Sequence, residues 1–234
     1  MSPRIAAAVL ILLLAACSRP TPAPQDAPPP ATPAPATAPA ETPPAPAPAA
    51  DDWTLPGSLH PLTTELELEA RFGKANLRSE TIPGAEGIGT HPVLLVFPDD
   101  PQRRLELLMA EGDPDGPIQL LRVQGSDSLW HSADGIRLGM TLAQLVARNG
   151  APLTFYGLSW DYGGTVQDWH GGKLANTPDN PAFHGVVLAP RDDDTDGLPL
   201  GDSTFRSDDP RWPAMGERLV VRELTVSWPR DGEG

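Results

Sequence analysis

The sequence predicts an α+β fold of two tandem units, each a short helix packed on an antiparallel sheet of three to four strands. Three observations favour this class. A helix-start pattern occurs twice at matching positions of two segments, and strand-like runs follow each occurrence. The part of the chain that is suited to folding, from Asp51 onward, holds roughly 180 residues, which suffices for one large domain or two small packed units. We place the units at residues 51–138 and 139–234.

Residues 1–16 predict a bacterial secretory signal peptide. Arg4 precedes an apolar run, Ile5 to Leu14, that is too short to span a bilayer. The segment Leu14-Ala15-Ala16-Cys17 resembles the lipobox of bacterial lipoproteins, which implies that Cys17 is lipidated and becomes the first residue of the mature protein. By the same resemblance, Ser18 implies sorting to the outer membrane. The alternative is an ordinary signal peptide that happens to contain the single cysteine.

The residues after Cys17 predict a disordered linker that extends to residue 50. Proline and alanine make up most of the segment from Pro20 to Ala50, and proline prevents helix formation while little apolar surface is present to bury. In the polyproline II conformation, at about 3.1 Å per residue, such a linker reaches roughly 90 Å from the membrane. The acyl chains on Cys17 supply the anchor. We therefore expect the folded part to be displayed in the periplasm.

The charge of the chain excludes one class of partner. The protein has 17 basic and 31 acidic residues and a net charge of -14, all of which belongs to the part after the linker. Such a surface repels nucleic acid and anionic lipid headgroups. We expect no nucleic-acid partner. Composition leaves open whether the charge serves only solubility or also attracts cations or a basic partner.

Two helices are predicted by matching start signals. Thr64-Glu65-Leu66-Glu67 and Thr141-Leu142-Ala143-Gln144 both have the capping-box pattern, in which the N-cap threonine and the third residue after it exchange hydrogen bonds. Both segments end at a glycine, Gly73 and Gly150, which suits a helix C-terminus. Apolar and charged residues alternate from Leu66 to Phe72, as in a strand. We give more weight to the caps and to the agreement between the copies.

Strand-like runs follow each predicted helix, separated by glycine, proline and aspartate clusters. In the first unit they are Val93 to Phe97, Arg103 to Met109 and Ile118 to Val123; in the second they are Leu153 to Tyr156, Thr165 to Trp169, Val186 to Ala189 and Leu219 to Trp228. One helix covers only one face of such a sheet. We therefore expect the opposite face to be open.

One segment of the second unit resembles a known family. Gly139-Met140-Thr141, Leu145, Gly150 and Pro152 resemble the small outer-membrane-assembly lipoproteins of the BamE (SmpA) type. The first unit departs from that pattern at Leu62-Thr63. Tandem copies of such a unit also resemble the β-lactamase-inhibitor-protein fold, in which two repeats form a concave sheet that grips a protein. These resemblances imply an envelope-assembly or macromolecule-binding role, and they transfer no partner-contacting residue to this chain.

An acidic segment is a candidate calcium site. Asp192, Asp194, Asp196 and Gly197 match the first half of a calcium-binding loop, in which alternating carboxylates converge on the ion. The twelfth position of that loop is Ser203, where a bidentate glutamate is expected. The sequence leaves open whether this segment binds Ca²⁺ or is a solvated acidic loop.

A second segment approaches the pattern of a serine hydrolase. Gly157-Leu158-Ser159-Trp160-Asp161 resembles the nucleophile elbow but lacks its last glycine, and His170 follows downstream. No helix pattern follows the serine, because Tyr162-Gly163-Gly164 favours a turn. The other histidines, His60, His91, His131 and His184, share no metal-binding spacing.

The same region is a candidate surface for a partner. Trp160, Asp161, Tyr162 and Trp169 lie close together in a glycine-rich segment, and aromatic residues with polar tips suit the binding of protein or sugar. Tryptophan equally often anchors a core. The sequence therefore predicts a non-enzymatic lipoprotein, anchored in the outer membrane and facing the periplasm, that binds a protein or another cell-envelope macromolecule. A calcium-dependent binding module and a periplasmic serine hydrolase are the alternatives.

Overall fold

The computed structural model describes residues 53–83, 89–110, 113, 115–177, 180 and 182–228. The signal peptide, the lipidated Cys17 and the linker predicted from the sequence lie outside these residues. All described residues belong to the unit of the chain that runs from Pro44 to Gly234. A search of the described helices finds none that is both long and apolar enough to cross a membrane.

The described chain has an α+β fold that consists mostly of strands. The helices are α1 (Glu65–Phe72), α2 (Leu142–Asn149), α3 (Met215–Arg218) and the short 3₁₀ helix η2 (Lys74–Asn76). The strands are β1 (Thr54–Leu55), β2 (Leu77–Pro83), β3 (Thr90–Val96), β4 (Leu105–Met109), β5 (Ile118–Gln124), β6 (His131–Ser132), β7 (Thr154–Tyr156), β8 (Val166–Asp168), β9 (Phe183–Pro190), β10 (Thr204–Arg206) and β11 (Leu219–Ser227).

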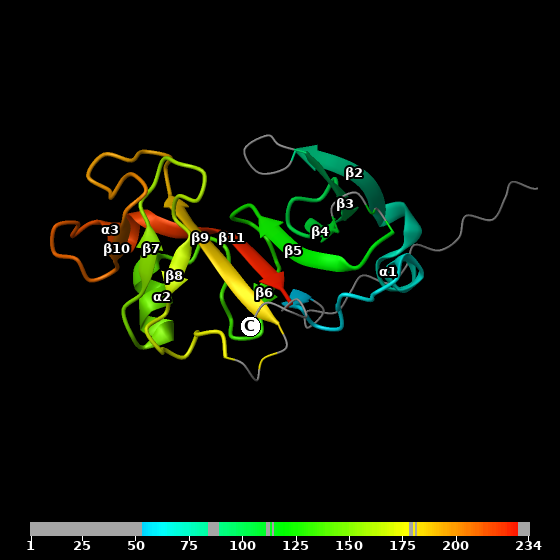
Figure 1. Ribbon diagram of the computed structural model, residues 1–234, viewed down its shortest axis with the longest axis horizontal. Coiled ribbons are helices and arrows are strands. Elements are labelled where there is room, and N and C mark those ends of the chain that lie inside the picture. The colour runs from blue at the N-terminus through cyan, green and yellow to red at the C-terminus, as the bar shows by residue number, and fades with distance from the viewer. Residues whose placement is uncertain are drawn as a thin grey trace, which may run out of the picture. The chain divides into compact units, whose positions relative to one another are not determined.

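The strands of the described chain form one large sheet and two small ones. The large sheet is antiparallel and has the order β2-β3-β4-β5-β11-β9, whereas β10-β7-β8 form a three-stranded antiparallel sheet. Strands β1 and β6 pair in parallel. Helix α1 lies beside the β2 end of the large sheet, and α2 lies beside the small sheet on the other side of the molecule (Figure 1).

Both predicted helices are present and begin as expected. Thr64 and Glu67 form a complete capping box at α1, and Thr141 and Gln144 form one at α2. Gly150 follows α2 in the left-handed conformation, with φ 76° and ψ 4°. The alternation of apolar and charged residues in the first segment does not produce a strand there, because the helix buries only Leu68 and Phe72 and leaves the charged residues between them outside the core.

One apolar core underlies the fold. Trp53 and Trp130 meet edge to face with ring centroids 5.0 Å apart, and Phe72 of α1 contacts Phe97 in the same way at 5.8 Å. Trp130 is fully buried, and its indole Nε1 donates a hydrogen bond to the Arg103 carbonyl at 2.8 Å. The core is thus held by aromatic packing in which the buried polar atom of Trp130 is satisfied.

The tandem-unit prediction gives each unit its own sheet, but the structure does not divide the strands in this way. Strand β11, from the predicted second unit, lies between β5 of the first unit and β9. Val123 of β5 is paired with Leu224 of β11, and Leu121 with Val226. All four side chains are buried, so the pairing joins two apolar surfaces into one continuous face.

The loop that leads into β8 contacts strand β9 of the large sheet. An isolated bridge pairs Thr165 with Val187 of β9, and the Leu188 amide donates a hydrogen bond to the Gly164 carbonyl at 2.9 Å. Gly164 has φ +80° and is packed so closely that a Cβ there would collide with the Leu188 carbonyl. This contact fixes the position of the loop between β7 and β8, which carries the candidate partner residues.

Candidate functional site

The end of β7 and the loop after it carry three aromatic side chains, Tyr156, Trp160 and Tyr162, which we call the aromatic cluster. The rings of Tyr156 and Trp160 meet edge to face with centroids 5.0 Å apart, and those of Trp160 and Tyr162 meet at 5.3 Å. Tyr162 is 51% exposed. Tyr156 was not among the predicted site residues, although it lies at the end of the strand that leads into the loop.

The loop is held by hydrogen bonds to the segment before β10. Leu158 donates its amide to the Pro199 carbonyl and accepts the Gly201 amide, both at 2.9 Å. The indole Nε1 of Trp160 donates to the Gly157 carbonyl at 2.9 Å. Asp161 is exposed beside the cluster. The aromatic cluster is therefore a fixed feature with a partly exposed rim, which reduces the conformational entropy lost on binding.

Trp169 is not part of this surface. Only 7% of it is exposed, and its ring packs edge to face against the ring of the buried His184, with centroids 5.5 Å apart. Its carbonyl accepts a hydrogen bond from the side chain of the buried Asn149, at the end of α2, at 2.9 Å. Of the two tryptophans named from the sequence, Trp160 lies in the loop and Trp169 lies in the core.

The acidic segment is tied to α3 by an arginine. Arg218 donates to the Asp194 side chain and carbonyl, each at 2.9 Å, and also to the Asp196 carbonyl. Arg222 pairs with Asp193 at 3.3 Å. Within the described residues, no three His, Cys, Asp or Glu side chains gather closely enough to hold a metal ion. The carboxylates of Asp192, Asp194 and Asp196 thus do not converge as a calcium loop requires.

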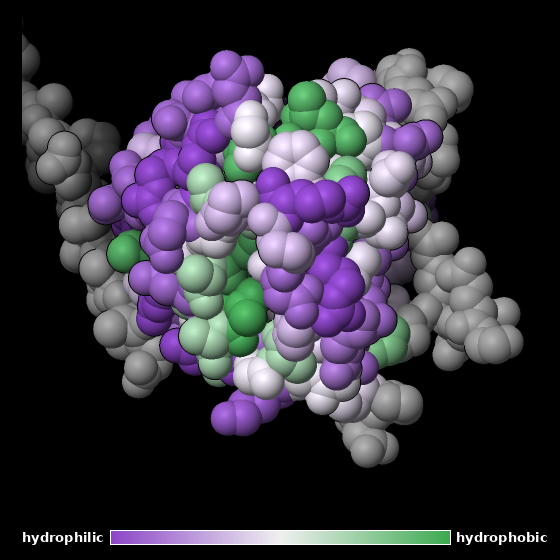
Figure 2. Space-filling model, turned by 90° about the vertical axis from the view of Figure 1, so that its left-hand side faces the viewer, coloured by the Kyte–Doolittle hydropathy of each residue, from purple (hydrophilic) through white to green (hydrophobic). Residues whose placement is uncertain are grey.

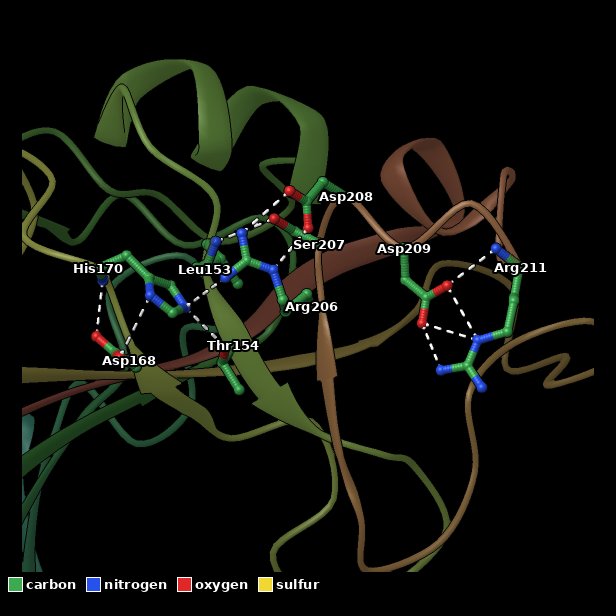
Figure 3. A network of polar contacts seen from close by, with 9 residues as sticks. All are labelled: Leu153, Thr154, Asp168, His170, Arg206, Ser207, Asp208, Asp209 and Arg211. Atoms are coloured by element: carbon green, nitrogen blue, oxygen red, sulfur yellow. Dashed lines mark hydrogen bonds and ion pairs between the residues drawn. The ribbon is translucent and has the colours of Figure 1, made fainter.

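A polar network surrounds His170 at the surface of the small sheet (Figure 3). The imidazole Nε2 lies 2.8 Å from the Thr154 hydroxyl and 3.4 Å from a nitrogen of Arg206, and Nδ1 lies 3.5 Å from the Asp168 carboxylate. Arg206 also donates two hydrogen bonds to Asp208, which hold the pKa of Asp208 below its ordinary value.

The network differs from the arrangement expected of a serine hydrolase. The hydroxyl that His170 contacts belongs to Thr154, a strand residue, whereas Ser159, the candidate nucleophile of the hydrolase alternative, lies in the loop after β7 with φ +67°. His170 itself has φ +49°, and its amide donates to Asp168 at 2.7 Å. These contacts order a cross-strand polar patch, in which Thr154 and Asp168 are register partners.

The sequence did not indicate a groove between α1 and the β2 end of the large sheet. It has a volume of about 570 Å³ and an apolar floor that includes Leu68, Leu94 and Met109. Its described lining residues come from five separate segments of the chain, so no local pattern marks it. By contrast, the side of the molecule that carries α2, α3 and β10 is mostly hydrophilic, with apolar areas interrupted by polar ones (Figure 2).

Comparison of the chain with models of known protein families, with curated protein sequences and with solved structures finds no match.

Proposed function

We propose that this protein is a non-catalytic binding module of the cell envelope, anchored by a lipid on Cys17 in the outer membrane and displayed in the periplasm. The observation that carries the binding role is the aromatic cluster. Tyrosine and tryptophan supply most of the binding energy at many protein interfaces, because they bury a large area at a low cost in conformational entropy. Here the Tyr162 ring is half exposed and supported from behind by Trp160.

The charge of the protein favours a basic or polar partner. With a net charge of -14, the molecule attracts cationic surfaces over distances of about one Debye length and speeds their encounter. Asp161 lies between Trp160 and Tyr162 in the sequence and is exposed. An aromatic anchor with a carboxylate beside it suits a partner that presents a basic residue next to an apolar one.

The tandem organisation is part of the same proposal. Helix α1 precedes the meander β2-β3-β4-β5. Helix α2 likewise precedes β7, β8, β9 and β11. These four strands are neighbours in that order if the isolated Thr165–Val187 bridge is counted as the link between the small sheet and β9. Both helices have a capping box. In this scheme the units meet through their last strands, β5 and β11, and β10 is an addition to the second. The likeness to BamE-type lipoproteins and to the β-lactamase-inhibitor fold belongs to this proposal and rests on the sequence pattern alone.

Photo-crosslinking tests the proposed partner surface. A photo-reactive amino acid is introduced at position 162 of the full chain in cells that export it, and the adducts are identified by mass spectrometry. Position 127, an exposed aspartate in the turn after β5, is the surface control, and position 169 is the buried control.

We expect a discrete protein adduct at position 162 that neither control gives. The adduct should disappear when Trp160→Ala removes the support of the Tyr162 ring in a chain that keeps its circular dichroism spectrum. Equal labelling at 162 and 127, or labelling at neither, would contradict the proposed surface.

A further inference from the structure

The groove beside α1 lies against an unpaired strand edge. Strand β2 is the terminal strand of the large sheet, and among the described elements only β3 pairs with it. Ser79, Glu80 and Thr81 of β2 line the groove together with the first turn of α1 and residues 115–117. The groove therefore exposes three consecutive residues of an edge strand.

The register shows which backbone groups of β2 point outward. Phe97 donates its amide to the Asn76 carbonyl at 2.8 Å, immediately before the first β2–β3 pair, Leu77 with Val96. Hydrogen-bonded pairs recur at every second position of an antiparallel ladder. Because the β2–β3 register contains no bulge, the backbone N–H and C=O groups of Ser79 and Thr81 face the open edge.

The rim of the groove is acidic. Among the residues that the structure describes, its lining includes the carboxylates of Glu65 and Asp115 and no lysine or arginine. A third carboxylate, Glu80, is already paired with Arg78 at 2.8 Å. An apolar floor with carboxylates at its rim is complementary to a peptide in which an apolar side chain is flanked by basic ones.

We propose that this edge and groove bind an extended peptide segment of another protein, which adds to β2 as a further strand. Backbone hydrogen bonds to Ser79 and Thr81 would supply affinity, and an apolar side chain in the groove, flanked by basic residues near Glu65 and Asp115, would supply specificity. The site is separate from the aromatic cluster and does not depend on its role. A second copy of this chain is disfavoured as the occupant, because pairing two β2 edges would bring two acidic rims together.

The probe is the blocked peptide Thr-Lys-Thr-Leu-Thr-Lys-Thr, which as a strand places both lysines and the leucine on one face. Binding to the full-length chain in detergent is measured by fluorescence anisotropy. We expect a dissociation constant on the order of 0.1 mM. A peptide with glutamate in place of both lysines should bind at least roughly tenfold more weakly.

Two changes test strand addition itself. Thr81→Pro removes one outward donor at a position where an edge strand tolerates proline, and should weaken binding roughly tenfold. Thr81→Val, which keeps the amide, should leave binding unchanged. In an added strand, the amides of alternate residues face β2 and the others face solvent. N-methylation of the amides that face β2 should abolish binding, and N-methylation of the others should not.

The proposal is overturned by any of three results: no binding at 1 mM peptide, binding that N-methylation and Thr81→Pro leave unchanged, or self-association of the chain that Thr81→Pro abolishes. The second result would mean non-specific charge attraction. The third would mean that a second copy occupies the edge. Thermal unfolding of both Thr81 variants establishes that the fold is intact.

Discussion

His184 is a buried imidazole whose ring is only partly satisfied. It is 8% exposed, and its Nε2 has no hydrogen-bond partner among the described residues. The Asn176 side chain holds the backbone of His184 through two hydrogen bonds. The His184 amide donates to Oδ1 at 3.0 Å, and Nδ2 donates to the His184 carbonyl at 2.9 Å. Burial lowers the pKa of His184, against a smaller opposite effect of the Asp134 charge.

Protonation of His184 should therefore make stability depend on pH. The unfolded chain takes up this proton near pH 6.5, whereas the folded chain resists it to a lower pH, so the free energy of unfolding falls as the pH drops below about 6.5. Urea unfolding at several pH values should show a loss of up to about 1.4 kcal/mol per pH unit from this group. His184→Phe should remove that part of the dependence. Parallel pH profiles for the two proteins would contradict the expectation.

At the residue scale, the sequence indicated some of the residues that lie at the surface of the candidate site. The glycine-rich segment indicated Trp160, Asp161 and Tyr162, which the loop keeps near the surface. Composition did not distinguish Trp169, because that distinction depends on His184 and Asn149, which are distant in the sequence. Side-chain direction at a strand end is set by tertiary packing and not by the neighbouring residues.

Gly164 determines how two elements meet, since it lies where the small sheet contacts β9. Its φ of +80° is unfavourable for other residues, and its close approach to Leu188 leaves no room for a side chain. Gly171 has a similar φ of +67° but no atom within 4 Å of its ideal Cβ position. The two glycines separate the effect of backbone strain from that of steric collision.

Substitution of each glycine by alanine should thus have different costs. Both changes should lower the free energy of unfolding by about 1–2 kcal/mol through the positive φ. Gly164→Ala should lower the free energy of unfolding by roughly 1–3 kcal/mol more, because the backbone of β9 at Leu188 must move. Urea unfolding of both variants measures the difference. Equal losses would show that the contact between the two sheets is loose.

At the element scale, helices were predictable and strand partners were not. The capping boxes at Thr64 and Thr141 are local signals of four residues, and both identify a helix start correctly. The pairing of β5 with β11 joins residues far apart in the sequence, and the alternation of apolar residues in each strand does not specify which strand it pairs with. The groove beside α1 was missed for the same reason.

For the whole molecule, the proposed anchor and the acidic folded part have complementary effects. A net charge of -14 disfavours contact of the folded part with anionic lipid headgroups, so in the proposed arrangement attachment would depend on the acyl chains at Cys17. Replacement of the Cys17 side chain should then release the protein from the membrane.

Cys17→Ser should move the protein from the membrane pellet to the soluble fraction after cell fractionation. The physical reason is that acyl chains contribute about 0.8 kcal/mol per buried CH₂ group, and serine accepts none of them. Metabolic labelling with a palmitate analogue should mark the natural chain and not the variant. A variant that stays in the pellet at high salt, while folded by circular dichroism, would contradict lipid anchoring.

The position of β11 inside the large sheet has a consequence for how the chain folds. Strand β11 is the last described strand in the sequence, yet it separates β5 from β9 in the finished sheet. While the ribosome is still producing the preceding residues, β5 and β9 have no partner at that position, and the large sheet cannot close. In a chain exported as proposed, the large sheet would therefore stay incomplete until β11 has been synthesised, and folding would be completed on the far side of the membrane.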